Sequence, residues 1–188
     1  MPILRRRQGS STRSTATLPL EMREQLHEPV LGAVPLDAEG SAWAVATAST
    51  LVVFTGSRRP EIHPWDEVEQ GSWDGQERVF TLRWTQQDRG DLVLKVPAGV
   101  RRGDAYAAAD VAPFAKALRQ RVEAAIIHSA VAALPNGATA TASVRRGSDG
   151  ELYSVPLPLI SQVDEAEDRR ALQELENRVR EGVGLPTR

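Results

Sequence analysis

The sequence predicts a mainly β protein with helices, in which about seven antiparallel strands precede one amphipathic helix. Short runs of β-branched and aromatic residues follow one another from residue 29 to residue 96, each bounded by turn residues. Apolar residues then recur at intervals of three and four after Asp110, and an Asp-Gly turn and a second helical pattern follow. We therefore expect an α+β chain that ends in a β-hairpin and a helix.

The first 18 residues contain mostly serine, threonine and arginine, with few apolar side chains. Such a segment buries too little surface to offset the entropy lost on ordering it. We predict a flexible tail over residues 1–18. A short helix is expected after Pro19, where Leu20 or Met22 and Leu26 have helical spacing.

The β-rich region begins with three strands joined by tight connections, which predict a meander. They cover residues 30–36, 41–47 and 50–55. Four further extended segments follow, and we expect them at residues 61–65, 66–74, 79–84 and 91–96. Pro64 ends the first of these segments or confines it to a sheet edge, because proline cannot donate to a ladder.

After a polar loop at residues 98–106, a helix is predicted over about residues 110–131. Asp110 caps it, and Pro135-Asn136-Gly137 ends it or the short segment after it. Its apolar positions share the spacing of one helix face, and they are Val111, Phe114, Ala115, Leu118, Val122, Ala125 and Ile126. This capping helix completes a domain over residues 19–134.

The rest of the chain predicts a hairpin over residues 138–158, around Gly147-Ser148-Asp149-Gly150, and a helix over residues 164–184. That helix carries a narrow apolar stripe, which includes Leu172, Leu175 and Val179. A stripe of this kind needs a surface to pack on. Two interpretations stay open: it docks on the chain's own sheet, or it binds a second copy or another protein.

Composition excludes several classes of function. The 23 basic and 25 acidic residues give no overall field that would attract nucleic acid or anionic lipid. The chain has no cysteine, so disulfides, thiolate catalysis and cysteine zinc sites are excluded. No phosphate loop, nucleophile elbow or dinucleotide turn is visible, so we expect no cofactor and no metal. The first residues lack the apolar core of a secretory signal, and we expect a cytoplasmic protein.

One segment of the sequence resembles a known protein family. Ile62-His63-Pro64-Trp65-Asp66-Glu67-Val68, with Ser72-Trp73-Asp74 and then residues 79–84, is similar to pleckstrin-homology-like (PH-like) proteins of actinobacteria whose function is uncharacterised. The resemblance spans about residues 30–130. It implies a bent antiparallel sheet, or partial barrel, of about seven strands whose open end is plugged by the helix.

The resemblance further implies a non-catalytic module that binds a lipid, a peptide or a protein. Members that bind phosphoinositides carry basic residues around the first hairpin loop. That loop is Asp37-Ala38-Glu39-Gly40 in this chain, and its carboxylates would repel a phosphate group. We therefore expect an interaction or scaffold module with a protein or peptide partner.

Trp65 is the expected partner-binding aromatic residue, because a proline before it and two acids after it indicate an exposed rim. The stripe residues Leu172, Leu175 and Val179 are the second candidate surface and the route to a homo-oligomer. An enzyme with a His63 and Asp66 site is the weakest alternative, because neighbours on a strand point to opposite faces.

Arginines offer a different alternative, a peripheral binder of anionic membranes or polyanions. The candidate anion-binding residues are Arg5, Arg6 and Arg7 in the tail, with Arg58 and Arg59 in a loop. A few arginines without a second anchor bind a membrane weakly. Specific recognition of nucleic acid is not expected.

Overall fold

The described part of the chain, residues 14–56, 58–86 and 88–187, is mainly β-structure with three α-helices in the computed structural model. The helices are α1 (Leu20–Arg23), α2 (Ala112–Ala125) and α3 (Ala166–Glu181). The strands before α2 are β1 (Ser14–Thr15), β2 (Gly32–Pro35), β3 (Ala42–Ala46), β4 (Thr50–Thr55), β5 (Glu61–Pro64), β6 (Val68–Asp74), β7 (Val79–Trp84), β8 (Leu92–Lys95), β9 (Gly99–Arg102) and β10 (Ala105–Ala108). After α2 come β11 (Ile126–Ala133), β12 (Thr139–Arg146) and β13 (Leu152–Leu157), and short 3-10 turns occupy η1 (Trp65–Glu67) and η2 (Ile160–Gln162). The predicted mixture of a mainly β chain with helices is confirmed.

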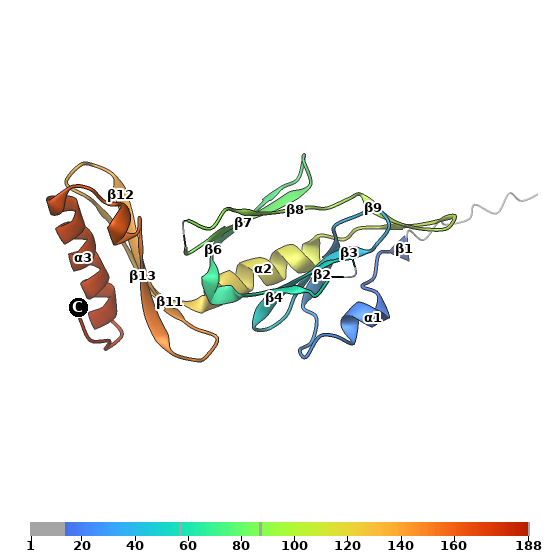
Figure 1. The fold of residues 1–188 in the computed structure, drawn as a ribbon, viewed down its shortest axis with the longest axis horizontal. Coiled ribbons are helices and arrows are strands. Elements are labelled where there is room, and N and C mark those ends of the chain that lie inside the picture. The colour runs from blue at the N-terminus through green and yellow to red at the C-terminus, as the bar shows by residue number, and fades with distance from the viewer. Residues whose placement is uncertain (1–13, 57, 87, 188) are drawn as a thin grey trace, which may run out of the picture.

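Two antiparallel sheets build the N-terminal half, in the orders β2-β3-β4-β5 and β6-β7-β8. Helix α2 lies between them, as Figure 1 shows. Its buried Phe114 and Leu118 share one core with Val53 of β4 and Leu82 of β7. The carboxylate of Asp110 accepts the Ala112 N–H at 3.0 Å, which satisfies one free donor at the helix start. Within the described residues none of the sheets closes into a barrel.

Helix α2 approaches strand β2 closely at Gly32. A Cβ atom placed on Gly32 would lie 2.5 Å from the backbone nitrogen of Phe114 and 2.6 Å from the carbonyl carbon of Pro113. Only glycine leaves room for helix backbone at this distance. The position of α2 between the sheets therefore requires a residue without a side chain at position 32.

The outer face of the four-stranded sheet is covered by the segment that precedes β2. Strand β1 pairs in parallel with β10, and Leu18 is buried beside Trp43 and Phe54. The flexible tail expected over residues 1–18 is therefore wrong for residues 14–18, because a few apolar contacts and a short ladder order them. The predicted helix after Pro19 is confirmed as the single turn α1.

Residues 99–108, which fall mostly within the predicted polar loop, form a hairpin instead. Strands β9 and β10 pair in antiparallel register, with Gly103 at φ +58° in the turn. Their side chains are largely polar or exposed, including Arg101, Arg102 and Tyr106, so the alternation that usually reveals a strand is missing.

Helix α2 is shorter than the helix expected over residues 110–131. It ends at Ala125, and strand β11 begins at the next residue. The β-branched Ile126 and Val131 pair with β12, Ile127 lies at a register shift in this ladder, and Asn136-Gly137 forms a hairpin turn in which Gly137 has φ +85°. Pairing with a distant strand therefore overrides the helical spacing of Ala125 and Ile126.

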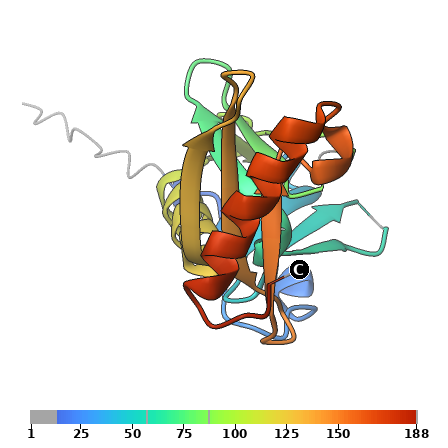
Figure 2. The ribbon, with the colours of Figure 1, turned by 90° about the vertical axis from the view of Figure 1, so that its left-hand side faces the viewer.

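The C-terminal half is the antiparallel sheet β11-β12-β13 with α3 packed on one face. Figure 2 shows α3, in red, lying across these strands. Leu172, Leu175 and Val179 are buried against Ala142 and Val144 of β12. Of the two interpretations of the stripe, the structure shows docking on the chain's own sheet, which leaves these three side chains covered. The predicted hairpin over residues 138–158 is present as β12 and β13, and β11 adds a third strand.

Candidate functional site

His63 and Asp66 are engaged by different neighbours and do not form a shared site. His63 lies on β5, and its Nδ1 is 2.8 Å from Nη2 of Arg89. Asp66 lies in η1, where its Oδ2 accepts the hydroxyl of Tyr153 at 2.9 Å. The sequence alternative of an acid–base pair therefore has no supporting geometry.

His63 belongs to a cluster that fastens the β7–β8 connection to β5. The guanidinium of Arg89 lies 3.6 Å above the ring of Trp84 and donates to Glu67 Oε2 at 3.0 Å. Because Arg89 only donates, Nδ1 of His63 must accept, and the ring proton sits on Nε2. Burial, followed by the nearby charge of Arg89, holds the pKa of His63 below its ordinary value near 6.5. His63 is thus a neutral core residue at neutral pH.

The state of His63 predicts a loss of stability in mild acid. Because the folded chain holds the pKa of His63 low, the unfolded chain takes up the proton first as the pH falls below about 6.5. The free energy of unfolding should be unaffected by His63 above that pH and should fall below it, by up to about 1.4 kcal/mol per pH unit.

Urea unfolding of the wild type and of His63→Gln between about pH 7 and about pH 5 measures this contribution. The substitution should flatten the pH dependence, whereas His27→Gln, at an exposed histidine, should leave it unchanged. Equal slopes in the wild type and His63→Gln would contradict the prediction.

The two halves of the protein meet at η1. Arg145, buried on β12, donates from Nη1 to the carbonyl oxygens of Val68 at 2.8 Å and Asp66 at 3.3 Å. Burial first, and then the hydrogen bond to Asp66, raises the pKa of Tyr153 well above its ordinary value. Tyr153 therefore stays protonated and donates to Asp66. This hydrogen bond is a structural contact between the two halves.

Trp65 is a core residue, and the exposed rim position expected for it is wrong. Its side chain is 4% exposed, and its Nε1 donates to the carbonyl oxygen of Thr47 at 3.1 Å. The proline before it is the N-cap of the turn η1 and the acids after it belong to that turn, and the indole packs in the core that α2 shares with the two sheets.

The predicted anion-binding arginines lie apart from these contacts. Arg58 and Arg59 are exposed in the β4–β5 connection. Arg5, Arg6 and Arg7 lie outside the described residues. Of the two predicted arginine groups, only the Arg58 and Arg59 pair lies within the described residues, and it is at the surface.

Strand β5 carries the clearest surface feature that sequence reasoning missed. Ile62 is 61% exposed, whereas its neighbour His63 is 7% exposed, the reverse of what hydropathy favours. Ile62 borders a hollow of about 220 Å³ beside the segment that follows α1. The apolar part of the lining comes from Leu26, Val52, Pro60 and Ile62. The buried His63 beside the exposed Ile62 is the feature that marks this hollow. The sequence alone does not reveal it, because the burial of His63 is known only from the structure.

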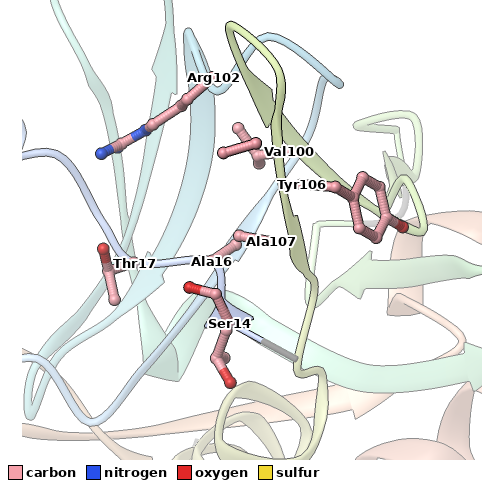
Figure 3. A pocket seen from close by; sticks show the side chains of 9 residues that line it. Ser14, Ala16, Thr17, Val100, Arg102, Tyr106 and Ala107 are labelled. Atoms are coloured by element: carbon pink, nitrogen blue, oxygen red, sulfur yellow. The ribbon is translucent and has the colours of Figure 1, made fainter. Parts of the chain in front are cut away.

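A smaller hollow of about 130 Å³ lies between β1 and the β9–β10 hairpin (Figure 3). Its floor consists largely of small side chains such as Ala16, Thr17 and Ala107. In Figure 3 the side chains of Arg102 and Tyr106 extend in opposite directions. It therefore offers a ligand less apolar surface than the hollow beside β5.

Two kinds of site are not found in the part of the chain that the structure describes. Over residues 14–56, 58–86 and 88–187, no helix has the length and apolar character needed to cross a membrane. Over the same residues, no three histidine or carboxylate side chains gather where they could hold a metal ion.

Comparison with known proteins gives this chain no relative. Protein-family models, curated proteins and solved structures yield no match to it. The function must therefore be inferred from the geometry of the described residues.

Proposed function

We propose that the protein is a non-catalytic interaction module that binds an extended segment of a partner protein along strand β5. The observation that carries this proposal is the exposed Ile62 at the rim of an apolar hollow. Apolar hollows that take one anchoring side chain are the usual centres of protein interfaces. The partner segment would place one apolar side chain in the hollow.

The backbone of β5 supports the same proposal. Strand β5 is an edge of its sheet, with β4 on one side and no second neighbour among the described strands. The Trp65 N–H donates to the carbonyl oxygen of Ser49, so the alternation of an antiparallel ladder turns the N–H and C=O of Ile62 outward. A partner strand can therefore form hydrogen bonds with Ile62, as in other cases of strand addition.

Two prolines restrict how such a segment can pair. Pro60 and Pro64 occupy the outward-facing positions on either side of Ile62, and neither has an N–H to donate. A long ladder along this edge would lack alternate donors, which protects the edge from aggregation. The arrangement favours a short segment in one register, centred on Ile62.

We further propose kinship with the PH-like family for the N-terminal half. Seven consecutive antiparallel strands, β2 to β8, precede a helix that packs between the two sheets they form. The β9–β10 hairpin and the C-terminal half are additions to that arrangement. The acidic loop between β2 and β3, which holds Asp37 and Glu39, favours a protein ligand over a phosphoinositide.

Substitution Ile62→Asp tests the proposed site. A phage library of random peptides, selected on the full chain, should yield sequences that share an apolar residue. Ile62→Asp should weaken their binding at least about tenfold, because a charge in the hollow replaces the apolar rim. Fluorescence polarisation of the labelled peptides measures the change.

The matched control is Val131→Asp on β11, because Val131 is 65% exposed and lies in the other half of the protein. It should leave peptide binding unchanged, and both variants should keep the wild-type thermal midpoint. Peptides that bind Ile62→Asp as tightly as the wild type would place the site elsewhere.

We keep anionic membranes as a second proposal, because Arg58 and Arg59 are exposed next to each other. Flotation with phosphatidylserine liposomes should then retain the protein at low salt and release it as salt screens the charges. Equal flotation of Arg58→Gln/Arg59→Gln and the wild type would exclude this pair from membrane contact.

A further inference from the structure

A third hollow lies where the two halves of the protein meet, and four segments line it. Its volume is about 250 Å³. The β3–β4 turn contributes Ser49, η1 contributes Asp66, the last turns of α2 contribute Arg121, and the end of β12 and the turn after it contribute Arg146 and Ser148. The elements on its walls belong to both halves, so the hollow exists only in the complete fold.

Arg121 is the unusual side chain in this hollow. Its Nε is fully buried, and no atom of the described residues accepts a hydrogen bond from it. A buried donor without an acceptor destabilises the fold. Arg121 lines the hollow, so an anion there would bind its guanidinium through charge-assisted hydrogen bonds, and Nε itself would be reached only if the side chain turns toward the ligand.

Arg146 brings a second positive charge to the same hollow from the other half of the protein. Its Nη1 donates to the carbonyl oxygen of Gly150 at 3.3 Å, which holds the side chain at the tip of the β12–β13 turn. Within the described residues neither Arg121 nor Arg146 forms an ion pair. Two arginines from separate elements thus share one hollow without carboxylate partners.

Three carboxylates lie nearby, and each has its own partners. Asp149, beside Gly147 of the lining, accepts the Glu151 N–H at 2.9 Å. Asp66 accepts the hydroxyl of Tyr153, and Arg145 lies behind it with its guanidinium on the Asp66 carbonyl oxygen. Glu28, which lines the hollow beside Ile62, accepts the N–H and hydroxyl of Ser49 at 2.9 and 2.5 Å. Among the described residues none of these carboxylates forms an ion pair with Arg121 or Arg146, so both guanidinium groups remain available to an anion.

We propose that this hollow binds a phosphate group, held between Arg121 and Arg146. Arginine suits this ligand because its planar fork matches the oxygens of phosphate and its charge persists at every physiological pH. The hydroxyl of Ser148 lies in the same lining and adds a donor. This site is separate from the hollow beside Ile62 and does not depend on it.

Titration of the full chain with inorganic phosphate, followed by the NMR signals of arginine Nε–H groups, tests the proposal. The Arg121 signal should shift saturably with phosphate and should not shift with chloride at equal ionic strength. Arg121→Gln and Arg146→Gln should each weaken binding about tenfold. O-phospho-L-serine, titrated in parallel, distinguishes the two sources of the group: tighter binding of phosphoserine indicates an esterified phosphate, and equal binding indicates the free anion.

Arg119→Gln is the matched control, because Arg119 lies on the same helix with its side chain 72% exposed beside Glu123. It should leave phosphate binding unchanged. The thermal midpoint of each variant shows whether it folds, and the double variant Arg121→Lys/Arg146→Lys keeps both charges if glutamine disturbs the fold. An Arg121 signal that never saturates with either ligand, or equal loss of binding in Arg119→Gln, would overturn the proposal.

Discussion

Replacing Gly32 by alanine should destabilise the N-terminal half by about 3 kcal/mol or more, because the new methyl group has no space. It would meet the backbone of Phe114 at 2.5 and 2.6 Å. Backbone cannot rotate away as a side chain can, and α2 cannot withdraw because Phe114 fills the core between the two sheets. Strand β2 or helix α2 would have to shift as a whole.

Urea unfolding, followed by the fluorescence of the buried tryptophans, measures this effect. Two glycines provide comparisons. A Cβ on Gly71 would also face α2, but it would meet the flexible end of Leu118 at 2.8 Å, so Gly71→Ala should cost less. A Cβ on Gly90 meets no atom within 4 Å, so Gly90→Ala should be nearly neutral. Equal stability of Gly32→Ala and Gly90→Ala would show that α2 does not pack on β2 as described.

Ending the chain at Gln162 should have an effect of similar or larger size in the C-terminal half. Truncation removes α3 and uncovers Ala140, Ala142 and Val144 on β12. Each fully buried leucine or valine lost from α3 contributes about 2 kcal/mol through burial, and a three-stranded sheet open on that face keeps little else to stabilise it. We expect β11, β12 and β13 to lose their order.

Differential scanning calorimetry and sedimentation distinguish the outcomes of this truncation. The thermal midpoint should fall, and the exposed face of β12 should promote association. Leu172→Ala, a milder change at a fully buried position, should cost about 2–5 kcal/mol, whereas Glu174→Ala on the exposed side of α3 should be nearly neutral. A truncated chain that keeps both its midpoint and its sedimentation mass would show that α3 contributes neither packing nor an interface.

Much of the N-terminal half could be predicted from sequence, because its strands alternate between two apolar environments. The run Ala42–Ala46 places Trp43 and Val45 on the outer core and Ala44 and Ala46 on the inner one. Both faces of this sheet are buried, which explains why the strand is nearly all apolar. The order of strands follows from short connections, which join neighbours in the sheet.

The boundary at Ala125 could not be predicted, because two signals coincide there. Helical spacing continues through Ile126, while the β-branched pair Ile126-Ile127 favours a strand. The decision depends on the ladder with residues 139–146, and sequence periodicity does not report that distant pairing. The Asn136-Gly137 pair is local evidence for a hairpin, but the same residues also suit the end of the helix or of a short segment after it.

The candidate sites were harder to predict from the sequence than the fold. His63 is buried because Trp84 and Arg89 approach it from the β7–β8 region, and its burial turns Ile62 outward. Arg121 and Arg146 line the same hollow only because the C-terminal half packs against η1, where Arg145 donates to the carbonyl oxygen of Asp66. Such sites depend on contacts between residues far apart in the chain, which local patterns do not contain.

The direct passage from α2 into β11 also determines how the molecule responds to force. No loop separates Ala125 from Ile126, so a load applied to the C-terminal sheet passes along one continuous backbone into the helix that fills the N-terminal core. Close-packed interiors transmit such strain instead of absorbing it. Arg145 gives the load a second route, through the carbonyl oxygens of Asp66 and Val68. Tension on the C-terminal end would therefore pull on α2 and η1 together, and the two halves would resist it as one mechanical unit.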